Sequence, residues 1–114
     1  MARTKKQFYF NSGVGPQLSY IHTDEDYMNV YCTVEFATSW AASLIALDLQ
    51  RLTNGKWTTI ASVGKKYLEG YGKQNRSFTN IAKKNASMRV KVKFYNHRNS
   101  SELTQTVYSN TWKR

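Results

Sequence analysis

The sequence predicts an all-β fold: an antiparallel β-sandwich of about seven to eight strands, forming a single domain over residues 1–114. Three observations point to this fold. Apolar and polar residues alternate with a period of two in most segments, as in strands with one buried face. Turn-forming residues separate these segments at short intervals. A composition that is 40% hydrophobic and 14% aromatic can supply one buried core in 114 residues.

The N-terminal part of the chain predicts three strands. Residues 6–11 form the first, which ends at the Ser-Gly-Val-Gly-Pro breaker of residues 12–16. Residues 17–22 form the second, and a polar turn at 23–26 follows it. Residues 27–36 show the clearest alternation, which predicts an inward row of Met28, Val30, Cys32, Val34 and Phe36.

Residues 39–52 are compatible with two structures. Their helix propensity is high, with Ser39 as a possible N-cap, so a small helix near 39–52 is one expectation. A strand from about residue 43 is the other, because it would align Ile45, Leu47 and Leu49 before the hairpin dipeptide at 54–55, Asn-Gly. The strand is favoured, since a helix here would be apolar almost all round and a small domain offers little to cover it.

The last three strands are predicted at residues 76–81, 87–97 and 104–112. The segment "SMRVKVKFYNHR" at 87–98 alternates most regularly. Its apolar residues are expected to point inward: Val90, Val92 and Phe94. Its cations are expected to point outward: Arg89, Lys91 and Lys93. Trp57, just after the Asn-Gly turn, is expected to pack across the sandwich.

A resemblance to known domains rests on the run "LDLQRLTNGKWTTIAS" followed by "SFTN…ASMRVKVKFYN…TQTVYSNTW". This pattern resembles the later strands of immunoglobulin-like and fibronectin-type-III-like domains, especially short extracellular bacterial versions, over roughly residues 43–112. The resemblance implies an immunoglobulin-like sandwich and an extracellular binding role. The immunoglobulin cysteine pair is absent, because Cys32 is the only cysteine. Its alternation with apolar neighbours indicates a core residue and not a reactive thiol.

The charge of the chain is high and unevenly distributed. The formal net charge is +10, from 17 Lys and Arg against 7 Asp and Glu. Residues 1–50 hold three of the cations and five of the acids, whereas residues 51–114 hold 14 cations and two acids. This excess favours anionic partners, such as nucleic acid, anionic membranes or polyanionic envelope polymers. If the basic strands lie side by side they form a basic face, and if they alternate between sheets the charge is spread.

The candidate binding residues all lie in this basic half. The predicted polyanion-binding residues are Lys65, Lys66, Lys73, Arg76, Lys83, Lys84, Arg89, Lys91, Lys93 and Arg98. Tyr67, Tyr71 and Tyr95 lie near cations and are candidate aromatic contacts, since tyrosine beside lysine suits sugar rings or unstacked bases. The alternative is that these rings only pack on the surface.

No catalytic residues, no resident metal and no cofactor are predicted. The two histidines, His22 and His97, have no cysteine or carboxylate at typical metal-ligand spacing, and no nucleophile motif is present. His22 near Asp24 and Asp26 could bind a cation weakly, but an acidic turn is more often simply solvated. We therefore expect a protein that is not an enzyme.

Three functional hypotheses follow. The leading one is a cationic, secreted bacterial protein that binds anionic cell-envelope polymers or membranes, as an antimicrobial, toxin-like or surface-associated factor, in a mature form lacking its signal peptide. The alternatives are an intracellular or phage-encoded nucleic-acid-binding protein and a structural assembly module. Residues 2–5, Ala-Arg-Thr-Lys, also match the first four residues of the processed histone H3 tail, and Lys6 departs from it.

Overall fold

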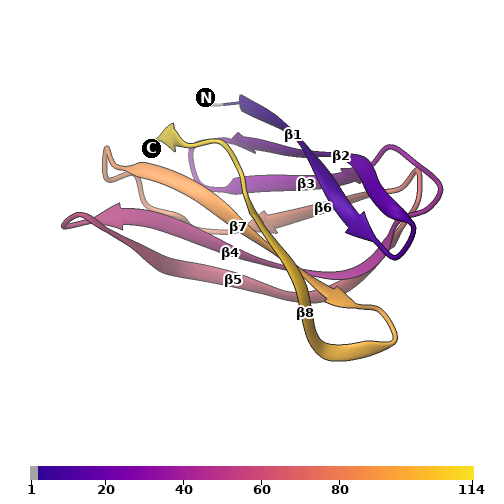
Figure 1. The fold of residues 1–114 in the computed structure, drawn as a ribbon. Coiled ribbons are helices and arrows are strands. Elements are labelled where there is room, and N and C mark those ends of the chain that lie inside the picture. Colours follow the sequence, from indigo (N-terminus) through magenta and orange to yellow (C-terminus); the bar gives the residue numbers. More distant parts are fainter. Residues whose placement is uncertain (1–2) are drawn as a thin grey trace.

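The computed structural model describes residues 3–114, and within them the regular structure consists of strands alone. Figure 1 shows their arrangement in two layers. The strands are β1 (Arg3–Ser12), β2 (Gly15–Glu25), β3 (Val30–Phe36), β4 (Ala42–Thr53), β5 (Lys56–Glu69), β6 (Lys73–Phe78), β7 (Ser87–Asn96), β8 (Asn99–Tyr108) and the short β9 (Trp112–Lys113).

The strands form two antiparallel sheets that pack on one another. One sheet has the order β1-β2-β3-β6, and the other has the order β5-β4-β7-β8, with β9 also paired to β7. The chain crosses between the sheets at the β3–β4, β5–β6 and β6–β7 connections (Figure 1). The expected all-β architecture of packed antiparallel sheets is therefore confirmed.

The segment that was compatible with a helix or a strand is the central strand β4. It pairs with β5 on one side and β7 on the other, so its backbone groups are satisfied by two neighbours. Ile45, Leu47 and Leu49 are fully buried, as the strand interpretation requires. At the turn that follows, Asn54 and Gly55 both have positive φ, 52° and 78°, which suits a two-residue hairpin.

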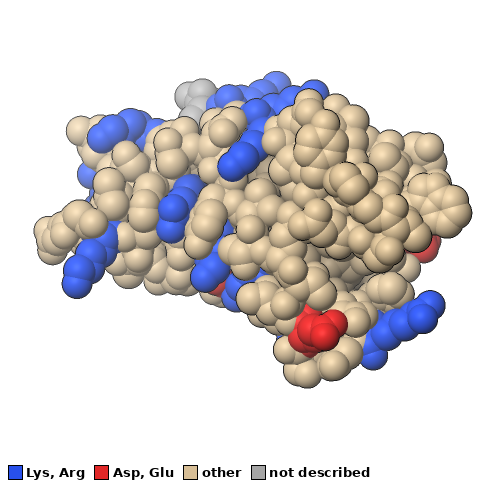
Figure 2. Space-filling model, in the orientation of Figure 1, with Lys and Arg blue, Asp and Glu red and all other residues tan. Residues whose placement is uncertain are grey.

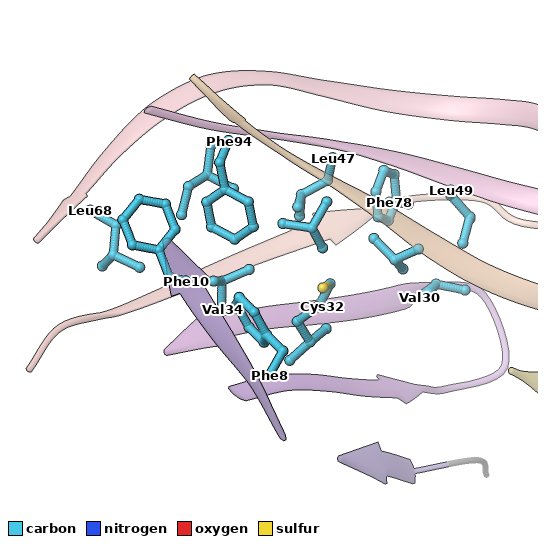
Figure 3. Packing of buried hydrophobic residues seen from close by; sticks show 14 of the residues in the cluster. Phe8, Phe10, Val30, Cys32, Val34, Leu47, Leu49, Leu68, Phe78 and Phe94 are labelled. Atoms are coloured by element: carbon cyan, nitrogen blue, oxygen red, sulfur yellow. The ribbon is translucent and has the colours of Figure 1, made fainter. Parts of the chain in front are cut away.

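The core lies between the two sheets and is rich in aromatic rings. Figure 3 shows buried side chains of both layers meeting there, with Phe8 and Phe10 of β1 near Phe94 of β7. The Phe10 and Phe94 ring centroids are 5.1 Å apart, and those of Phe10 and Phe36 are 5.0 Å apart. Cys32 lies fully inside this core, so the prediction that it is a core residue is confirmed.

Several local expectations were wrong. The turn predicted at residues 23–26 is strand as far as Glu25, and the strand predicted at 76–81 lies at Lys73–Phe78. Met28 is 52% exposed, because β3 begins only at Val30 and the Asp26 carboxylate accepts hydrogen bonds from the amides of Met28 and Asn29. Trp57 does not belong to the core cluster and packs on the outer face of its sheet. Residues 104–112 are not one strand; β8 ends at Tyr108, and a break precedes β9.

The N-terminal match to the histone tail falls mostly on a paired strand. Ala2 lies outside the described residues, while Arg3, Thr4 and Lys5 belong to β1 and pair with Asp24, Thr23 and His22 of β2, respectively. These three residues therefore form part of a sheet. Over residues 3–114, no helix long and apolar enough to cross a membrane is present.

Candidate polyanion-binding face

The central strand β7 carries the predicted cationic row on the outer surface of its sheet. Met88, Val90, Val92 and Phe94 are fully buried, so the alternating residues Arg89, Lys91 and Lys93 must point away from the core. β7 lies between β4 and β8, which places Gln50, Asp48 and Ala46 opposite these cations on one side. We call this outer surface of sheet β5-β4-β7-β8 the basic face.

Arg89 lies between two aromatic rings that come from strands on either side of β7. The carbon of its guanidinium lies 4.3 Å from the centroid of the Trp57 ring and 4.0 Å from the centroid of the Tyr108 ring. Its Nε donates a hydrogen bond of 2.8 Å to Oε1 of Gln50. The two ring contacts and the hydrogen bond restrict the movement of the cation. The Nη groups make no hydrogen bond with the residues that the structure describes, so they remain available to an external oxyanion.

Lys93 and Lys91 differ in their partners. Nζ of Lys93 lies 3.0 Å from Oδ2 of Asp48, and the two side chains are 23% and 13% exposed. Asp48 also accepts a hydrogen bond of 2.7 Å from Ser62, which holds the carboxylate in place. Lys91, between the other two cations, forms no ion pair or hydrogen bond within residues 3–114. In the predicted row, Arg89 is therefore held between two rings, Lys91 has no partner within residues 3–114, and Lys93 is neutralised by a carboxylate.

Lys65 and two tyrosines extend the basic face towards the β7–β8 turn. Nζ of Lys65 lies 4.1 Å from the centroid of the Tyr95 ring, which places a cation of β5 over a ring of β7. The Tyr67 ring lies 6.1 Å from that of His97, and its hydroxyl donates to Glu69. Loss of hydration and the hydrogen bond to Glu69 raise the pKa of Tyr67 above its usual 10.0. Tyr67 is therefore a neutral ring beside the cations.

The charge of the chain is concentrated on the strands of this sheet. They carry eight Lys and Arg against three Asp and Glu, whereas the strands of sheet β1-β2-β3-β6 carry five against three. In Figure 2, Lys and Arg atoms form several separate patches on a surface made mostly of other residues, and Asp and Glu atoms occupy a few smaller spots. The basic strands β5 and β7 thus share one sheet with β4 between them, whereas the basic strands β1 and β6 lie in the other sheet, so the charge is only partly gathered on one face.

Other predicted binding residues lie away from this face. Lys73 and Arg76 belong to β6 in the opposite sheet, and Arg76 donates to the carbonyl of Gly64 across the gap between β6 and β5. Lys66 lies on the edge strand β5, paired with the inward-facing Ile45. Lys66, Lys73 and Arg76 therefore line an edge of the sandwich.

The remaining predicted residues are at the two ends of the sandwich. Lys83 and Lys84 lie in the β6–β7 loop, where Nζ of Lys83 is 5.2 Å from the centroid of the Tyr27 ring. Arg98 lies in the β7–β8 turn at the opposite end, and Tyr71 lies in the β5–β6 turn at that same end. These three cations therefore lie in the connections at the two ends of β7, with Lys83 directed to the β2–β3 loop, and Tyr71 is not part of the basic face.

Trp57, Tyr108 and Gln50 were missed as site residues. Trp57 and Gln50 come from one hairpin, and the two-residue turn at 54–55 sets the register that brings them to one face. That signal was present in the sequence and could have placed Trp57 outside the core. Tyr108 comes to Arg89 through the pairing of β8 with β7, whose irregular register has no sequence signal.

The acidic residues near His22 are engaged within the protein. Nε2 of His22 lies 3.0 Å from Oε1 of Glu35. Oδ2 of Asp24 lies 3.0 Å from Nη2 of Arg3. A hydrogen bond from the Tyr31 hydroxyl, with further bonds from backbone amides, lowers the pKa of Asp26. Within residues 3–114, no three His, Cys, Asp or Glu side chains gather where they could hold a metal ion.

Comparison of the chain with protein-family models, curated proteins and solved structures finds no match. A function must therefore be inferred from the chemistry of the basic face itself.

Proposed function

We propose that this protein is not an enzyme and that it binds extended anionic polymers through the basic face. The observation that carries this proposal is the unpaired Lys91 at the centre of a row in which Arg89 is already oriented by two rings. Alternation along a strand spaces the three cations at intervals of about 6–7 Å. That spacing suits successive charges on one extended chain better than a single compact anion.

The fixed orientation of side chains on the basic face favours a role in binding over a role in solubility alone. Cations that serve only solubility need no fixed orientation, whereas Arg89 is held by Gln50, Trp57 and Tyr108. Fixing a side chain before binding lowers the entropy that is lost when a ligand orders it. A planar guanidinium with free Nη groups is also suited to bidentate contact with phosphate or carboxylate.

The proposed setting is outside a bacterial cell, where anionic envelope polymers are the ligand class. The strand order supports an immunoglobulin-like relationship: β3–β6 corresponds to the B–E pair, β4-β7-β8 corresponds to C-F-G, and β5 occupies the C′ position. The departures are an extra edge strand, β1, and the absence of a D-strand equivalent between β5 and β6. Cys32 occupies the B-strand position, without a cysteine on β7.

Single-stranded nucleic acid is the second candidate ligand. Trp57, Tyr95 and Tyr108 lie on the basic face among the cations, as expected of a surface that stacks bases. However, one face of each ring is already covered by Arg89 or Lys65. Contact with the charged backbone of the polymer is therefore favoured over stacking of its bases.

The test compares two double variants with the same loss of charge. Arg89→Thr/Lys91→Thr removes two cations of the basic face and leaves the Lys93–Asp48 pair intact. Arg3→Thr/Lys5→Thr removes two cations from β1 in the other sheet. Retention on isolated bacterial cell wall, immobilised polyphosphate and single-stranded DNA is measured over a salt series. Log affinity decreases with log salt, and the magnitude of this slope should be smaller by about 2 for the first variant, about one unit for each lost contact.

The control variant separates a site from a net-charge effect. The change on β1 should have a small effect, since those cations lie outside the basic face. Equal losses for the two double variants would mean that only the net charge matters, and the proposed face would be wrong. A preference for DNA over cell wall and polyphosphate would favour the nucleic-acid candidate.

A further inference from the structure

The most exposed of the three tryptophans, Trp40, lies at the end of the sandwich where the β1–β2, β3–β4, β5–β6 and β7–β8 connections meet (right-hand side of Figure 1). Trp40 belongs to the β3–β4 connection and is 69% exposed, so packing within the chain does not explain a tryptophan there. Exposure alone does not make a binding site, because single exposed apolar residues are common on protein surfaces. The surroundings of Trp40 therefore decide what its ring can bind.

Trp40 lines two open clefts. One cleft, of about 250 Å³, is also lined by Asn11 at the end of β1 and by His97 of the β7–β8 turn. The other, of about 280 Å³, is also lined by Glu69 at the end of β5. Ala42, which pairs with Glu69 across β4 and β5, lines both clefts. Because the two clefts share two lining residues they are neighbours, and we call them together the Trp40 site.

The segment that carries Trp40 is held in place on both sides of the ring. The Thr38 hydroxyl donates a hydrogen bond of 2.6 Å to Oε1 of Gln17 in β2, and Ala41 is buried. A Cβ atom at Gly70 would lie 2.5 Å from the carbonyl oxygen of Thr38, so the β5–β6 turn packs directly against this segment. The position of the segment is thus set before a ligand arrives, which lowers the entropy lost on binding.

The Trp40 site contains polar groups without a partner. Trp112 is the only tryptophan whose indole nitrogen is hydrogen-bonded within residues 3–114, so Nε1 of Trp40 is free. Outside the strand pairing, Asn11 bonds only through its backbone amide within the same residues, which leaves its exposed side-chain amide free. The exposed His97 ring lies 6.1 Å from the Tyr67 ring and makes no hydrogen bond there either. These groups offer both donors and acceptors beside an apolar ring.

The charges around the Trp40 site are balanced. None of the residues that line the cleft of about 250 Å³ is Lys, Arg, Asp or Glu, although the chain has a net charge of +10. Lys65 and Glu102 contact residues of this lining and carry opposite charges. Arg98 follows His97 in the chain, and Glu69 lines the other cleft. The Trp40 site therefore lacks the excess of positive charge that a polyanion requires.

We propose that the Trp40 site binds an uncharged saccharide chain, independently of the basic face. A pyranose ring has an apolar face of C–H groups, which packs on an indole ring, and an edge of hydroxyls. Asn11 and His97 can exchange hydrogen bonds with these hydroxyls, and Glu69 accepts them. Each cleft is smaller than the usual small-molecule pocket of about 300–1,000 Å³. Two adjacent clefts with a ring between polar groups suit successive sugar units of one chain.

Other ligand classes fit this site less well. A nucleic-acid base would also stack on Trp40, but the phosphates that accompany it would meet the carboxylates of Glu69 and Glu102. An apolar ligand would cover the polar groups of Asn11 and His97 without giving them a hydrogen-bond partner. An uncharged sugar has neither disadvantage, because it is neutral and its hydroxyls both donate and accept.

The experiment titrates the whole chain with three hexasaccharides. Cellohexaose and the hexamer of N-acetylglucosamine are uncharged and have flat C–H faces, whereas hexagalacturonate carries a carboxylate on each ring. Calorimetry measures the affinity, and tryptophan emission reports contact with an indole. We expect an uncharged hexasaccharide to bind and to change the emission. Trp40→Ala should weaken this binding about tenfold or more and remove the change in emission, and Trp40→Phe should weaken it less because a ring remains.

Asn11→Ala and His97→Ala should each weaken the binding about threefold, as expected for one lost hydrogen bond. Tyr27→Ser is the matched control, because it removes an aromatic ring that is 80% exposed at the opposite end, and it should bind as the wild type does. All of the changed side chains are exposed, and urea denaturation checks that each variant is folded.

Two results would overturn the proposal directly: the wild type binds neither uncharged hexasaccharide, or Trp40→Ala binds them as well as the wild type does. Tighter binding of hexagalacturonate that depends on Trp40 would also overturn it, since the site would then select an anionic polymer.

Discussion

Aromatic rings hold more cations in this protein than carboxylates do. Over residues 3–114, Lys5, Lys65, Lys83 and Arg89 lie over tyrosine or tryptophan rings, while three Lys or Arg side chains pair with a carboxylate. A ring orders a cation without neutralising it, because its attraction comes from a quadrupole and it carries no net charge. This keeps the positive charge available to an external anion, which is the property that the proposed binding requires.

Cys32 allows a test of the core at the level of one residue. Burial raises the pKa of its thiol to about 12, so the reactive thiolate is scarce at neutral pH. We expect no labelling by an aromatic disulfide reagent at about pH 8 until denaturant is added. Stoichiometric labelling should then follow. Rapid labelling of the native protein would contradict the assignment of Cys32 to the core.

At the scale of the strand, alternation predicts faces well because it is a local property. The inward and outward residues of β7 were predicted correctly, and so was the inward row of β4. The same reasoning failed at Met28. The carboxylate of Asp26 accepts a hydrogen bond from the Met28 amide, and β3 begins only at Val30, so Met28 is not part of the alternating strand. A side-chain hydrogen bond can thus outweigh an apolar period of two.

The candidate site could be predicted only in part, because alternation along a strand says nothing of which strands lie beside it. Alternation predicted that Arg89, Lys91 and Lys93 share one surface, and the structure confirms this. It carried no information on the partner of each cation, because the pairing of β7 with β4 and β8 joins segments far apart in the chain. The ion pair of Lys93 and the ring contacts of Arg89 depend on that long-range register.

The β4–β5 turn provides a test at the level of one hairpin. Gly55 has φ of +78°, so Gly55→Ala should lower the free energy of unfolding by about 1 kcal/mol through backbone strain. The matched control is Gly64→Ala in β5, where an added Cβ meets nothing within 4 Å and φ lies outside the left-handed range. Urea denaturation compares the two variants. Equal effects would mean that the turn does not require a left-handed glycine.

For the molecule as a whole, polar side chains join the two sheets where the aromatic core does not reach. At one edge, buried Gln74 of β6 donates to the carbonyls of Lys66 and Tyr67 of β5. At the other edge, Gln105 of β8 bonds the backbone of β1 at Tyr9 and Asn11. These contacts satisfy strand edges that would otherwise be exposed, which limits pairing with other chains.

The end of the sandwich that holds the β2–β3 and β6–β7 loops is closed by a buried ion pair. Glu25 of β2 accepts a hydrogen bond of 2.6 Å from Nε1 of Trp112 in β9, which links the two sheets. Nη1 of Arg114 lies 3.4 Å from the same carboxylate. The guanidinium of Arg114 also donates to the carbonyls of Asp26, Tyr27 and Ile81, so it anchors two loops.

Removal of one charge from this pair should be costly. Glu25→Gln keeps an acceptor for Trp112 but leaves the fully buried Arg114 side chain without a counter-charge, which typically costs about 3–5 kcal/mol. The free energy of unfolding in urea measures this loss. Glu25→Gln combined with Arg114→Met should recover part of it, because no unpaired charge then remains buried. A loss below about 1 kcal/mol for Glu25→Gln alone would show that the carbonyl contacts of Arg114, and not Glu25, compensate its charge.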